Sequence, residues 1–467
     1  MPRIIGSSLL VLLLASAASF AGSSPAERLA EAVRIKTVSH YDTGQIDYGE
    51  FERFHAFLRA AYPRVFSQLQ VEVISDYSLM INWPGTDSAL QPILFLAHMD
   101  VVPVEPGTEQ DWQHPAFAGV LADGRIYGRG TLDDKQGLLG LMEAAETLLA
   151  EGFTPRRTIM FAFGHDEEIS GKAGAVGIAR RMRELGLHFE WMLDEGGMVL
   201  SDSPVLPGRP MAMVNVAEKG YLTLTLVATG DGGHSSSPPR VSTIGRLSAA
   251  LALIESNPFP PRLVGPVESM LETLGPYAGQ PERFVFANLW LTGGFVANRM
   301  AEDRLTQPLV RTTVALTTFN AGVKDNVIPQ RAEAKVNVRL LPGDTPETVV
   351  QRIKALIDDP SIDISEENWG EMPPVSDHEA EGFRVIAAAV ESVYPEAIVT
   401  PSMLFATTDT RHYLGLADNQ YRFHGVMMAS SQAKSIHGTD EYVDVDSYEK
   451  SIEVARQMML LGARHAP

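Results

Sequence analysis

The 467-residue chain contains no cysteine. Disulfide bonds and thiolate metal sites are therefore excluded. A lipid anchor of the bacterial lipoprotein type is not expected either, because it needs a cysteine near the N-terminus. Any metal site in this protein must be built from histidine and carboxylate side chains.

Positive charge is also scarce, because 38 Lys and Arg residues oppose 58 Asp and Glu residues, for a formal net charge of −20 at pH 7. This balance makes nucleic acid and anionic membranes poor partners. Part of the acidity is available for metal ligands, although most of it is expected on a solvated surface. The hydrophobic fraction of 45% is that of an ordinary globular protein, and the length allows two or three domains.

The apolar run at the N-terminus, residues 4–14, is too short for a comfortable membrane span. It follows a single positive charge, Arg3, and precedes a run of small residues that ends at Ala21. This arrangement is typical of a secretory signal peptide, here residues 1–21; an uncleaved anchor is the alternative. We therefore expect an exported protein, periplasmic or secreted, with no stable membrane insertion after signal cleavage.

The most informative stretch is an apolar run, residues 93–97, that stops at His98 and is followed by Asp100. Such runs are typical of strands buried on both faces of a parallel sheet, and ligands bind at the carboxyl ends of these strands. Because residues i and i+2 of a strand point the same way, His98 can present one ring nitrogen to a metal while Asp100 accepts the N–H of the other. A strand-end histidine held by a local aspartate, without metal, is the simpler alternative.

Two further apolar runs end in acidic residues. Residues 158–163 precede His165-Asp166-Glu167-Glu168, and residues 189–193 precede Asp194-Glu195. Carboxylates crowded at one edge of a sheet are costly unless a cation neutralises them. The three strand ends together therefore predict a divalent metal site.

Two other places add candidate ligands. A glycine-rich turn, residues 124–130, leads to Asp133-Asp134 before a helix expected over residues 138–150. Acidic residues at a helix N-terminus are favourable on their own, so capping is the better interpretation of this pair taken alone. His437 lies in a polar loop before the last expected helix, although a lone histidine is usually not a ligand.

The middle of the chain has a different pattern. Residues 221–226 and 334–340 alternate between apolar and polar side chains, which is typical of an antiparallel sheet with one solvated face. We therefore predict an inserted α+β domain within an α/β domain that has a mixed, mainly parallel sheet. The expected boundaries are 22–213 and 370–467 for the α/β domain, 214–369 for the insert and 257–321 for an elaboration of the insert.

These segments together resemble the co-catalytic zinc peptidase family of aminoacylase, carboxypeptidase G and succinyl-diaminopimelate desuccinylase. The nearest branch is that of carboxypeptidase S and the secreted N-acyl-amino-acid hydrolases. The matching segments are His98-Met99-Asp100, Gly128-Arg129-Gly130-Thr131-Leu132-Asp133-Asp134-Lys135, Asp166-Glu167-Glu168, Leu193-Asp194-Glu195-Gly196-Gly197, Asn326-Val327-Ile328-Pro329 and Ser435-Ile436-His437-Gly438. The resemblance covers nearly the whole mature chain and implies a zinc-peptidase-like catalytic domain with an inserted lid domain.

The resemblance also implies roles for the site residues. His98, Asp133 and Asp194 would hold one Zn²⁺, and His437, Glu168 and Asp133 a second, so that Asp133 bridges two ions per chain; Co²⁺ or Mn²⁺ are possible substitutes. Glu167 would be the general base, Asp100 would orient His98, and the Asp133–Asp134 peptide would be cis. In the lid, His234 would help polarise the scissile carbonyl, and Asn326 and Arg339 would hold the free carboxylate of the substrate.

The expected activity is hydrolysis of an amide or peptide bond beside a free C-terminal carboxylate, by a carboxypeptidase or an N-acyl-amino-acid hydrolase. A non-catalytic exported metal- or peptide-binding protein on the same fold is the alternative, although Glu167 would then have no purpose. A Rossmann-type oxidoreductase is disfavoured because Gly171, Gly174 and Gly177 lack the dinucleotide spacing. The expected partners are a small-molecule or short-peptide substrate and, as in many relatives, a second copy bound through the lid.

One loop departs from the branch, which usually has Gly-Asn-Thr-Asp where this chain has Ala-Thr-Thr-Asp at residues 406–409, so the substrate preference stays open. Glu167 and Glu168 are expected on extended backbone, where successive side chains point opposite ways. The remaining expectations concern structural residues, namely His165, His412 and His424 as structural histidines and Trp112, Trp191 and Trp290 in the core or between segments.

Overall fold

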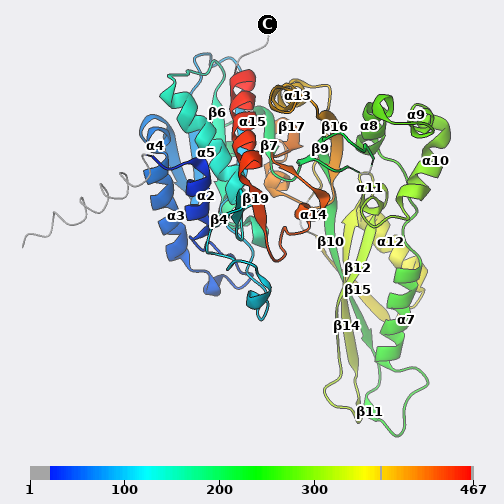
Figure 1. Cartoon of the computed structure of the whole chain (residues 1–467). Coiled ribbons are helices and arrows are strands. Elements are labelled where there is room, and N and C mark those ends of the chain that lie inside the picture. The colour runs from blue at the N-terminus through cyan, green and yellow to red at the C-terminus, as the bar shows by residue number, and fades with distance from the viewer. Residues whose placement is uncertain (1–21, 204, 369–370, 464–467) are drawn as a thin grey trace, which may run out of the picture. The chain divides into compact units, whose positions relative to one another are not determined.

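The computed structural model describes residues 22–203, 205–368 and 371–463, so the expected signal peptide lies outside the described residues. The chain forms two compact units (Figure 1). The first unit comprises Met1–Val216, Ser376–Pro401 and Thr408–Pro467, and the second comprises Ala217–Val375 and Ser402–Thr407. The sequence gives no indication that residues 402–407 belong to the second unit. Across the described ranges, no helix is both long and apolar enough to cross a membrane.

The first unit is built on a mixed sheet with a parallel centre, as predicted. β3 (Ile93–His98) lies between β6 (Ile159–Gly164) and β7 (Phe189–Asp194) and is parallel to both. β17 (Ala417–Arg422) continues the parallel set beside β7. The strand order is β1-β2-β6-β3-β7-β17-β9-β8-β18, with β16 paired to β9. The other strands are β1 (Gln70–Ile74), β2 (Ser78–Trp83), β8 (Val199–Leu200), β9 (Met211–Glu218), β16 (Ile398–Leu404) and β18 (Met427–Met428).

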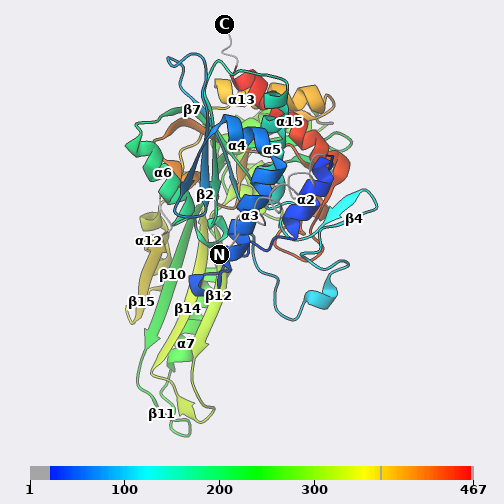
Figure 2. The ribbon, with the colours of Figure 1, turned by 90° about the vertical axis from the view of Figure 1, so that its left-hand side faces the viewer.

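Helices cover both faces of this sheet because its central strands are apolar on both sides. Phe95 of β3 packs in one core with α5 (Lys135–Ala150) and α15 (Val445–Ala463), whereas Leu94 and Leu96 pack on the opposite face against α6 (Gly174–Glu184). Figure 2 shows α6 on one side of the strands and α5 with α15 on the other. Further helices of this unit are α2 (Pro25–Val33), α3 (Tyr48–Ala61), α4 (Pro63–Gln68), α13 (Glu381–Val393) and α14 (Ser430–Ala433).

Local sequence signals set where the helices begin. At α2, the Ser24 hydroxyl accepts the N–H of Glu27 and the Glu27 carboxylate accepts the N–H of Ser24, with Pro25 in the first turn. Thr345 and Thr348 form the same reciprocal cap at α12 (Pro346–Ile357). These caps satisfy backbone donors that have no partner inside the helix.

The second unit contains a four-stranded antiparallel sheet in the order β12-β14-β10-β15. The strands are β10 (Gly220–Thr229), β12 (Thr313–Ala321), β14 (Arg331–Leu340) and β15 (Ile362–Asn368). Leu222, Leu224 and Leu226 of β10 are buried with α7 (Thr243–Ser256) and α12, on the face that the alternation predicted. Beyond the end of β10, a short pair forms between β11 (Gly233–His234) and β13 (Val327–Ile328).

The segment 257–321 contains helices followed by a sheet strand. The helices are α8 (Gly265–Leu274), α9 (Glu282–Phe286), α10 (Leu289–Met300) and α11 (Gln307–Val310). β12, which closes the segment, is an edge strand of the four-stranded sheet and not part of the elaboration. Its side chains are largely exposed, so it lacks the apolar alternation that identified β10 and β14.

Candidate active site

The carboxyl ends of β6, β3 and β7 meet at one edge of the first unit's sheet. His98, the last residue of β3, lies opposite Gly164, the last residue of β6. Asp194 ends β7 on the other side of β3. The strand register thus brings the three polar segments together, as the apolar runs predicted.

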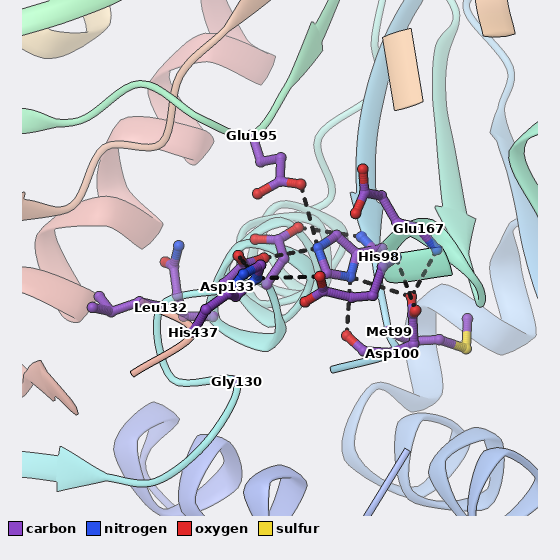
Figure 3. Close-up of polar contacts among 12 residues, drawn as sticks. His98, Met99, Asp100, Gly130, Leu132, Asp133, Glu167, Glu195 and His437 are labelled. Carbon is purple, nitrogen blue, oxygen red and sulfur yellow. Dashed lines mark hydrogen bonds and ion pairs between the residues drawn. The ribbon is translucent and has the colours of Figure 1, made fainter. Parts of the chain in front are cut away.

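His98 is held by Asp100 in one ring orientation (Figure 3). Its Nδ1 lies 2.9 Å from the backbone carbonyl oxygen of Asp100 and 3.3 Å from the Asp100 carboxylate, so Nδ1 carries the hydrogen. Nε2 then faces Asp133 Oδ1 at 2.9 Å and Glu195 Oε1 at 3.3 Å. This leaves Nε2 as the atom available to a metal ion.

Asp133 directs its two carboxylate oxygens toward two different histidines. Oδ1 faces His98, whereas Oδ2 lies 3.0 Å from His437 Nε2, which is itself 3.2 Å from Glu168 Oε2. Two groups of candidate ligand atoms, each within 4.8 Å of one another, therefore share Asp133: His98, Asp133 and Glu195, and Asp133, Glu168 and His437. A carboxylate placed in this way can bridge two ions.

Four of the five sequence-predicted ligands lie in these groups, and Asp194 does not. Glu195 takes the third place beside His98 and Asp133, while Asp194 Oδ1 accepts the N–H of Glu195 at 3.0 Å. Asp194 is the last residue of β7 and Glu195 is the next residue, and the turn that begins here decides which carboxylate faces His98. A strand-end pattern identifies the Asp-Glu pair but does not distinguish its members.

The loop that carries Asp133 is organised by Glu441, a buried residue to which the sequence analysis assigned no role. Oε1 of Glu441 accepts the N–H groups of Gly130 at 3.0 Å and Leu132 at 2.8 Å, and Oε2 accepts Arg129 Nη1 at 2.6 Å. The supporting sheet consists of β4 (Val120–Ala122), β5 (Arg125–Tyr127) and β19 (Tyr442–Asp444). The nearness of Glu441 to His437 in the sequence was the signal that could have identified it.

Asp133 and Asp134 are joined by a cis peptide bond, as the resemblance implied. The capping interpretation of this pair was wrong, because Asp134 makes no side-chain capping bond to α5. Its Oδ2 instead accepts the backbone N–H of His98 at 3.2 Å, which ties the start of α5 to the end of β3.

Glu167 and Glu168 lie in a tight turn, η3 (Glu167–Ile169), so the expectation of extended backbone was wrong. The cause is Asp100, whose carboxylate accepts the N–H of Glu167 at 3.1 Å and of Glu168 at 3.2 Å. The Ser170 N–H closes the turn on the carbonyl oxygen of Glu167. Glu168 then joins His437 and Asp133, while Glu167 lies beside the cluster (Figure 3).

The electrostatics of the cluster reflect crowded carboxylates. Burial is the main cause, and the charge of Asp133 the second, that raises the pKa of Glu168 to about 7 and the pKa of Glu195 to about 8. Burial opposes ionisation of Asp133 too, but hydrogen bonds from His437 and His98 hold its pKa well below the usual range. Burial and the neighbouring Asp409 raise the pKa of Glu167 well above its ordinary value.

The donor set fits divalent cations. Imidazole nitrogens and carboxylate oxygens, without thiolates, suit zinc, cobalt or manganese. Among the described residues, Glu168 Oε1 is buried without a hydrogen-bond partner, as expected of an oxygen that has a cation for its partner. A positive charge would also offset the repulsion that raises the pKa values of Glu168 and Glu195.

Each histidine expected to be structural bonds a neighbouring group. His165 Nδ1 lies 2.7 Å from the Ser78 hydroxyl, His412 Nε2 lies 2.9 Å from the carbonyl oxygen of Ser170, and His424 Nδ1 lies 2.9 Å from Gln136 Nε2. The contact between His412 and Ser170 supports the end of the turn that carries Glu167.

The predicted lid residues all lie in the second unit, at two different places. His234 in β11 pairs with Val327, and the neighbouring Ser235 N–H donates to the carbonyl oxygen of Asn326 at 3.2 Å. Arg339 lies near the end of β14, with its guanidinium 4.3 Å from the centroid of the Tyr221 ring. Asn326 precedes β14, whereas Arg339 lies eight residues beyond its first residue, Arg331, which is roughly 26 Å along the strand at about 3.3 Å per residue. The two residues therefore lie at opposite ends of this strand, and their shared role in holding the substrate's carboxylate stays a prediction.

Comparison with known proteins identifies a peptidase family. The model of peptidase family M20/M25/M40 matches residues 94–461. "Probable carboxypeptidase S-like 2" of Dictyostelium discoideum is 39% identical over 435 residues, which cover 92% of this chain and 83% of that protein. "N-fatty-acyl-amino acid synthase/hydrolase PM20D1" of Bos taurus is 38% identical over 442 residues, which cover 93% of this chain and 87% of that protein.

Among solved structures, the M20 family metallo-carboxypeptidase Sso-CP2 of Sulfolobus solfataricus has the same fold, with a TM-score of 0.70 at 19% identity. The match covers 94% of this chain and 99% of that chain. The matched range spans most of the chain, and the candidate ligands His98, Asp133, Glu168, Glu195 and His437 lie within it. The chain therefore belongs to peptidase family M20/M25/M40 and is a metal-dependent peptidase or amidohydrolase.

Proposed function

We propose that this protein is an exported dinuclear zinc hydrolase that cleaves an amide or peptide bond beside a free carboxylate. The observation that carries the proposal is that Asp100 positions both His98 and the turn that contains Glu167. Its carbonyl oxygen fixes the metal-facing tautomer of His98, and its carboxylate holds the turn that presents Glu167 and Glu168. A binding protein would have no need for Glu167 at this position.

The residues of the site would have three roles, which are to hold the metal ions, to transfer a proton and to position the other residues. His98, Asp133 and Glu195 or Asp194 would hold one ion, and Asp133, Glu168 and His437 the other. Two bound divalent ions would supply an activated water and polarise the scissile carbonyl. Glu167 would take a proton from the attacking water on its carboxylate and deliver it to the leaving nitrogen. Asp100 would keep that carboxylate in reach through the backbone of the turn.

We propose N-acyl amino acids as the substrate class, with dipeptides as the second candidate. Two relatives, 39% and 38% identical over the aligned residues, carry the names of a carboxypeptidase S-like protein and of an N-fatty-acyl-amino acid synthase/hydrolase. Both names fit substrates that end in a free carboxylate. Arg339 is our candidate for binding it, because a planar guanidinium pairs with a carboxylate through two parallel hydrogen bonds.

We further propose that the working form is a homodimer in which the second unit of each copy contributes residues to the active site of the other copy. His234 and Asn326 lie together, whereas Arg339 lies at the far end of β14. If all three act on one substrate, His234 and Asn326 must come from one copy and Arg339 from the other. Export rests on the N-terminal signal pattern at residues 1–21.

The test is a hydrolysis screen with added Zn²⁺ that compares N-acetyl and N-oleoyl amino acids, dipeptides and the C-terminal amide of each. The free acids should be cleaved and the amides should lose at least roughly tenfold in kcat/KM, because a charge-assisted pair is worth about 2–5 kcal/mol. Equal cleavage of acid and amide would contradict the carboxylate requirement. Tight zinc binding without cleavage of any compound would contradict the hydrolase.

A further inference from the structure

The two histidines of the cluster are held in different ways. His98 ends a buried strand of the central sheet, and its side chain is only 2% exposed. The side chain of His437 is 51% exposed, and this residue lies in a loop between α14 and β19. His437 and Asp440 also have positive φ angles, of 61° and 56°, which are unfavourable for residues other than glycine. Neither packing nor local backbone preference therefore keeps His437 beside Asp133 and Glu168.

Arg129 connects the loop of His437 to the loop that carries Asp133. Its Nη2 donates to the carbonyl oxygen of Gly438 at 3.0 Å, directly after His437, and its Nη1 donates to Glu441 Oε2 at 2.6 Å. Oε1 of Glu441 accepts the backbone N–H of Asp133 at 3.3 Å, besides two earlier N–H groups of the same loop. We call Arg129 and Glu441 the brace, because together they join the backbone of one candidate ligand to the neighbour of another.

The brace lies in the interior of the protein. The side chains of Arg129 and Glu441 are 3% and 0% exposed, and the guanidinium lies 5.4 Å from the centroid of the Trp112 ring. The N–H of Gln113 donates to the Asp440 carboxylate at 2.6 Å and holds the His437 loop at a second point. A planar guanidinium donates in a fixed fork geometry, so its two acceptors are held at a defined separation. The brace therefore differs from an exposed ion pair, whose long side chains stay mobile.

The backbone pairing of β5 with β19 supports the same two loops only where they leave the sheet. This pairing joins Tyr127 to Tyr442, and Tyr442 lies five residues after His437. Arg129 instead holds Gly438, the residue next to the imidazole that faces Asp133. The sheet therefore sets the base of the His437 loop, and the guanidinium sets the part of the loop that carries the candidate ligand.

We propose that Arg129 is a positioning residue for the second ion, the ion that His437 would bind. The guanidinium holds the two loops in place before that ion binds, so binding does not have to order a half-exposed histidine. The first ion would use His98, which packing and the strand already hold, and it depends less on the brace. This role rests on the dinuclear site of the proposed function, although it does not depend on which bond is cleaved.

The experiment is a calorimetric titration of the metal-free full chain with Zn²⁺, in which Arg129→Lys is compared with the wild type. Lysine keeps a positive charge beside Glu441, but an ammonium lacks the fork that also reaches Gly438. Glu168→Gln removes a ligand of the second ion and so identifies the binding step that belongs to this ion. We expect this step to weaken by about 10–100-fold in Arg129→Lys, and the other step to stay within about twofold of the wild type.

Arg125→Lys is the matched control. Arg125 Nε lies 3.0 Å from Asp444 Oδ1, so this pair also joins β5 to β19, but both side chains are more than two-fifths exposed. The control should bind both ions like the wild type, and equal melting temperatures of the metal-free proteins would show that Arg129→Lys is folded. Glu441→Gln changes the other half of the brace and should weaken the same step, so the test does not depend on one variant.

Three results would overturn the role of Arg129. The first is a folded Arg129→Lys that binds both ions as the wild type does. The second is a loss that is equal in both binding steps or that Arg125→Lys shares, because the brace would then support the sheet and not the second ion. The third is a wild type with a single zinc step, which would also contradict the dinuclear site. A wild type that binds two ions but cleaves no compound would contradict the proposed hydrolase alone.

Discussion

The carboxylate of Asp100 accepts the backbone N–H of Glu167 at 3.1 Å, and the backbone carbonyl oxygen of the same Asp100 lies 2.9 Å from His98 Nδ1. One residue therefore sets both the metal-facing nitrogen and the turn that holds the proposed base. Neither contact involves the reacting atoms directly, so Asp100 acts as a positioning residue. Its substitution should affect metal binding and turnover together.

Replacing Asp100 with Asn should lower zinc affinity and kcat by about 10–100-fold, since partners of this kind orient metal ligands. An amide has one acceptor oxygen, so it cannot accept both N–H groups of the turn as the carboxylate does. The measurement is zinc content after dialysis against a chelator, together with kcat. Asp166→Asn is the control, because Asp166 accepts the N–H groups of Ala173 and Gly174 and should affect stability without loss of zinc. Full zinc affinity in Asp100→Asn would contradict the positioning role.

Glu167→Gln should retain both ions and the fold but lose roughly 10²–10⁴-fold in kcat, because the proton acceptor is removed. Glu168→Gln is the neighbouring control and should lose metal, since Glu168 Oε2 lies with His437 and Asp133. The two variants separate the roles of adjacent glutamates in one turn. Near-normal turnover in Glu167→Gln would refute the assignment of the base.

Asp194 and Glu195 compete for one ligand position. The geometry of the turn after β7 favours Glu195, which lies 3.3 Å from His98 Nε2, whereas the resemblance favours Asp194. We expect one of Asp194→Asn and Glu195→Gln to lose one ion per chain and the other to retain both, as measured by metal analysis. Asp133→Ala is the reference and should lose both ions, because it belongs to both groups. Full occupancy in Asp133→Ala would contradict the bridging assignment.

Lys219 should make the stability of the second unit depend on pH. It is buried, its Nζ donates to the carbonyl oxygen of Arg311 and to Thr313, and burial, aided by Arg339, lowers its pKa from 10.5 to about 7. Between pH 7 and 10.5 the unfolded chain holds a proton that the folded chain has released. Stability contributed by this residue therefore rises with pH, by up to about 1.4 kcal/mol per unit.

The measurement for Lys219 compares denaturant unfolding of the wild type and Lys219→Met at pH 7 and pH 9. The free-energy difference between them should shift in favour of the wild type at the higher pH. Lys335→Met, at a half-buried position on β14 whose side chain is 39% exposed, should show no such shift. A difference that is the same at both pH values would mean that Lys219 stays protonated in the folded chain.

Sequence patterns predicted the parts of this site that depend on strand order. The apolar runs before His98 and Glu167 identified β3 and β6, and the parallel register of those strands follows from their burial on both faces. Sequence patterns failed where a single hydrogen bond sets the backbone conformation. The turn at Glu167 depends on the carboxylate of Asp100, which is distant in the sequence.

Hydrogen bonds between residues far apart in the chain could not be predicted from the sequence either. Glu441 organises the loop before Asp133 across more than 300 residues, and no periodicity marks it. Trp290, in the first turn of α10, is 84% exposed, so the expectation that it packs in the core or between segments was wrong, and within α10 only Val296 and Ala297 are buried. By contrast, the separation of Asn326 from Arg339 follows from the extended strand between them, once residues 331–340 are recognised as one strand.

The last prediction tests whether His234 of one copy and Arg339 of the other complete one active site. His234→Ala and Arg339→Ala should each be nearly inactive, since an electrostatic donor contributes about 2.7–4 kcal/mol to catalysis and a buried carboxylate pair about 2–5 kcal/mol. A mixed dimer of the two variants would contain one site with both residues intact and one site with neither. Because random mixing makes half of the dimers mixed, activity should recover to about a quarter of the wild-type value. Mixing His234→Ala with Asn326→Ala is the matched control and should not recover activity, because His234 and Asn326 lie together in one chain. Co-expression with two different affinity tags isolates the mixed dimers for assay. If isolated mixed dimers of the first pair stay as inactive as their parents, or if the wild type is a monomer in light scattering, then His234 and Arg339 do not complete one site across two copies.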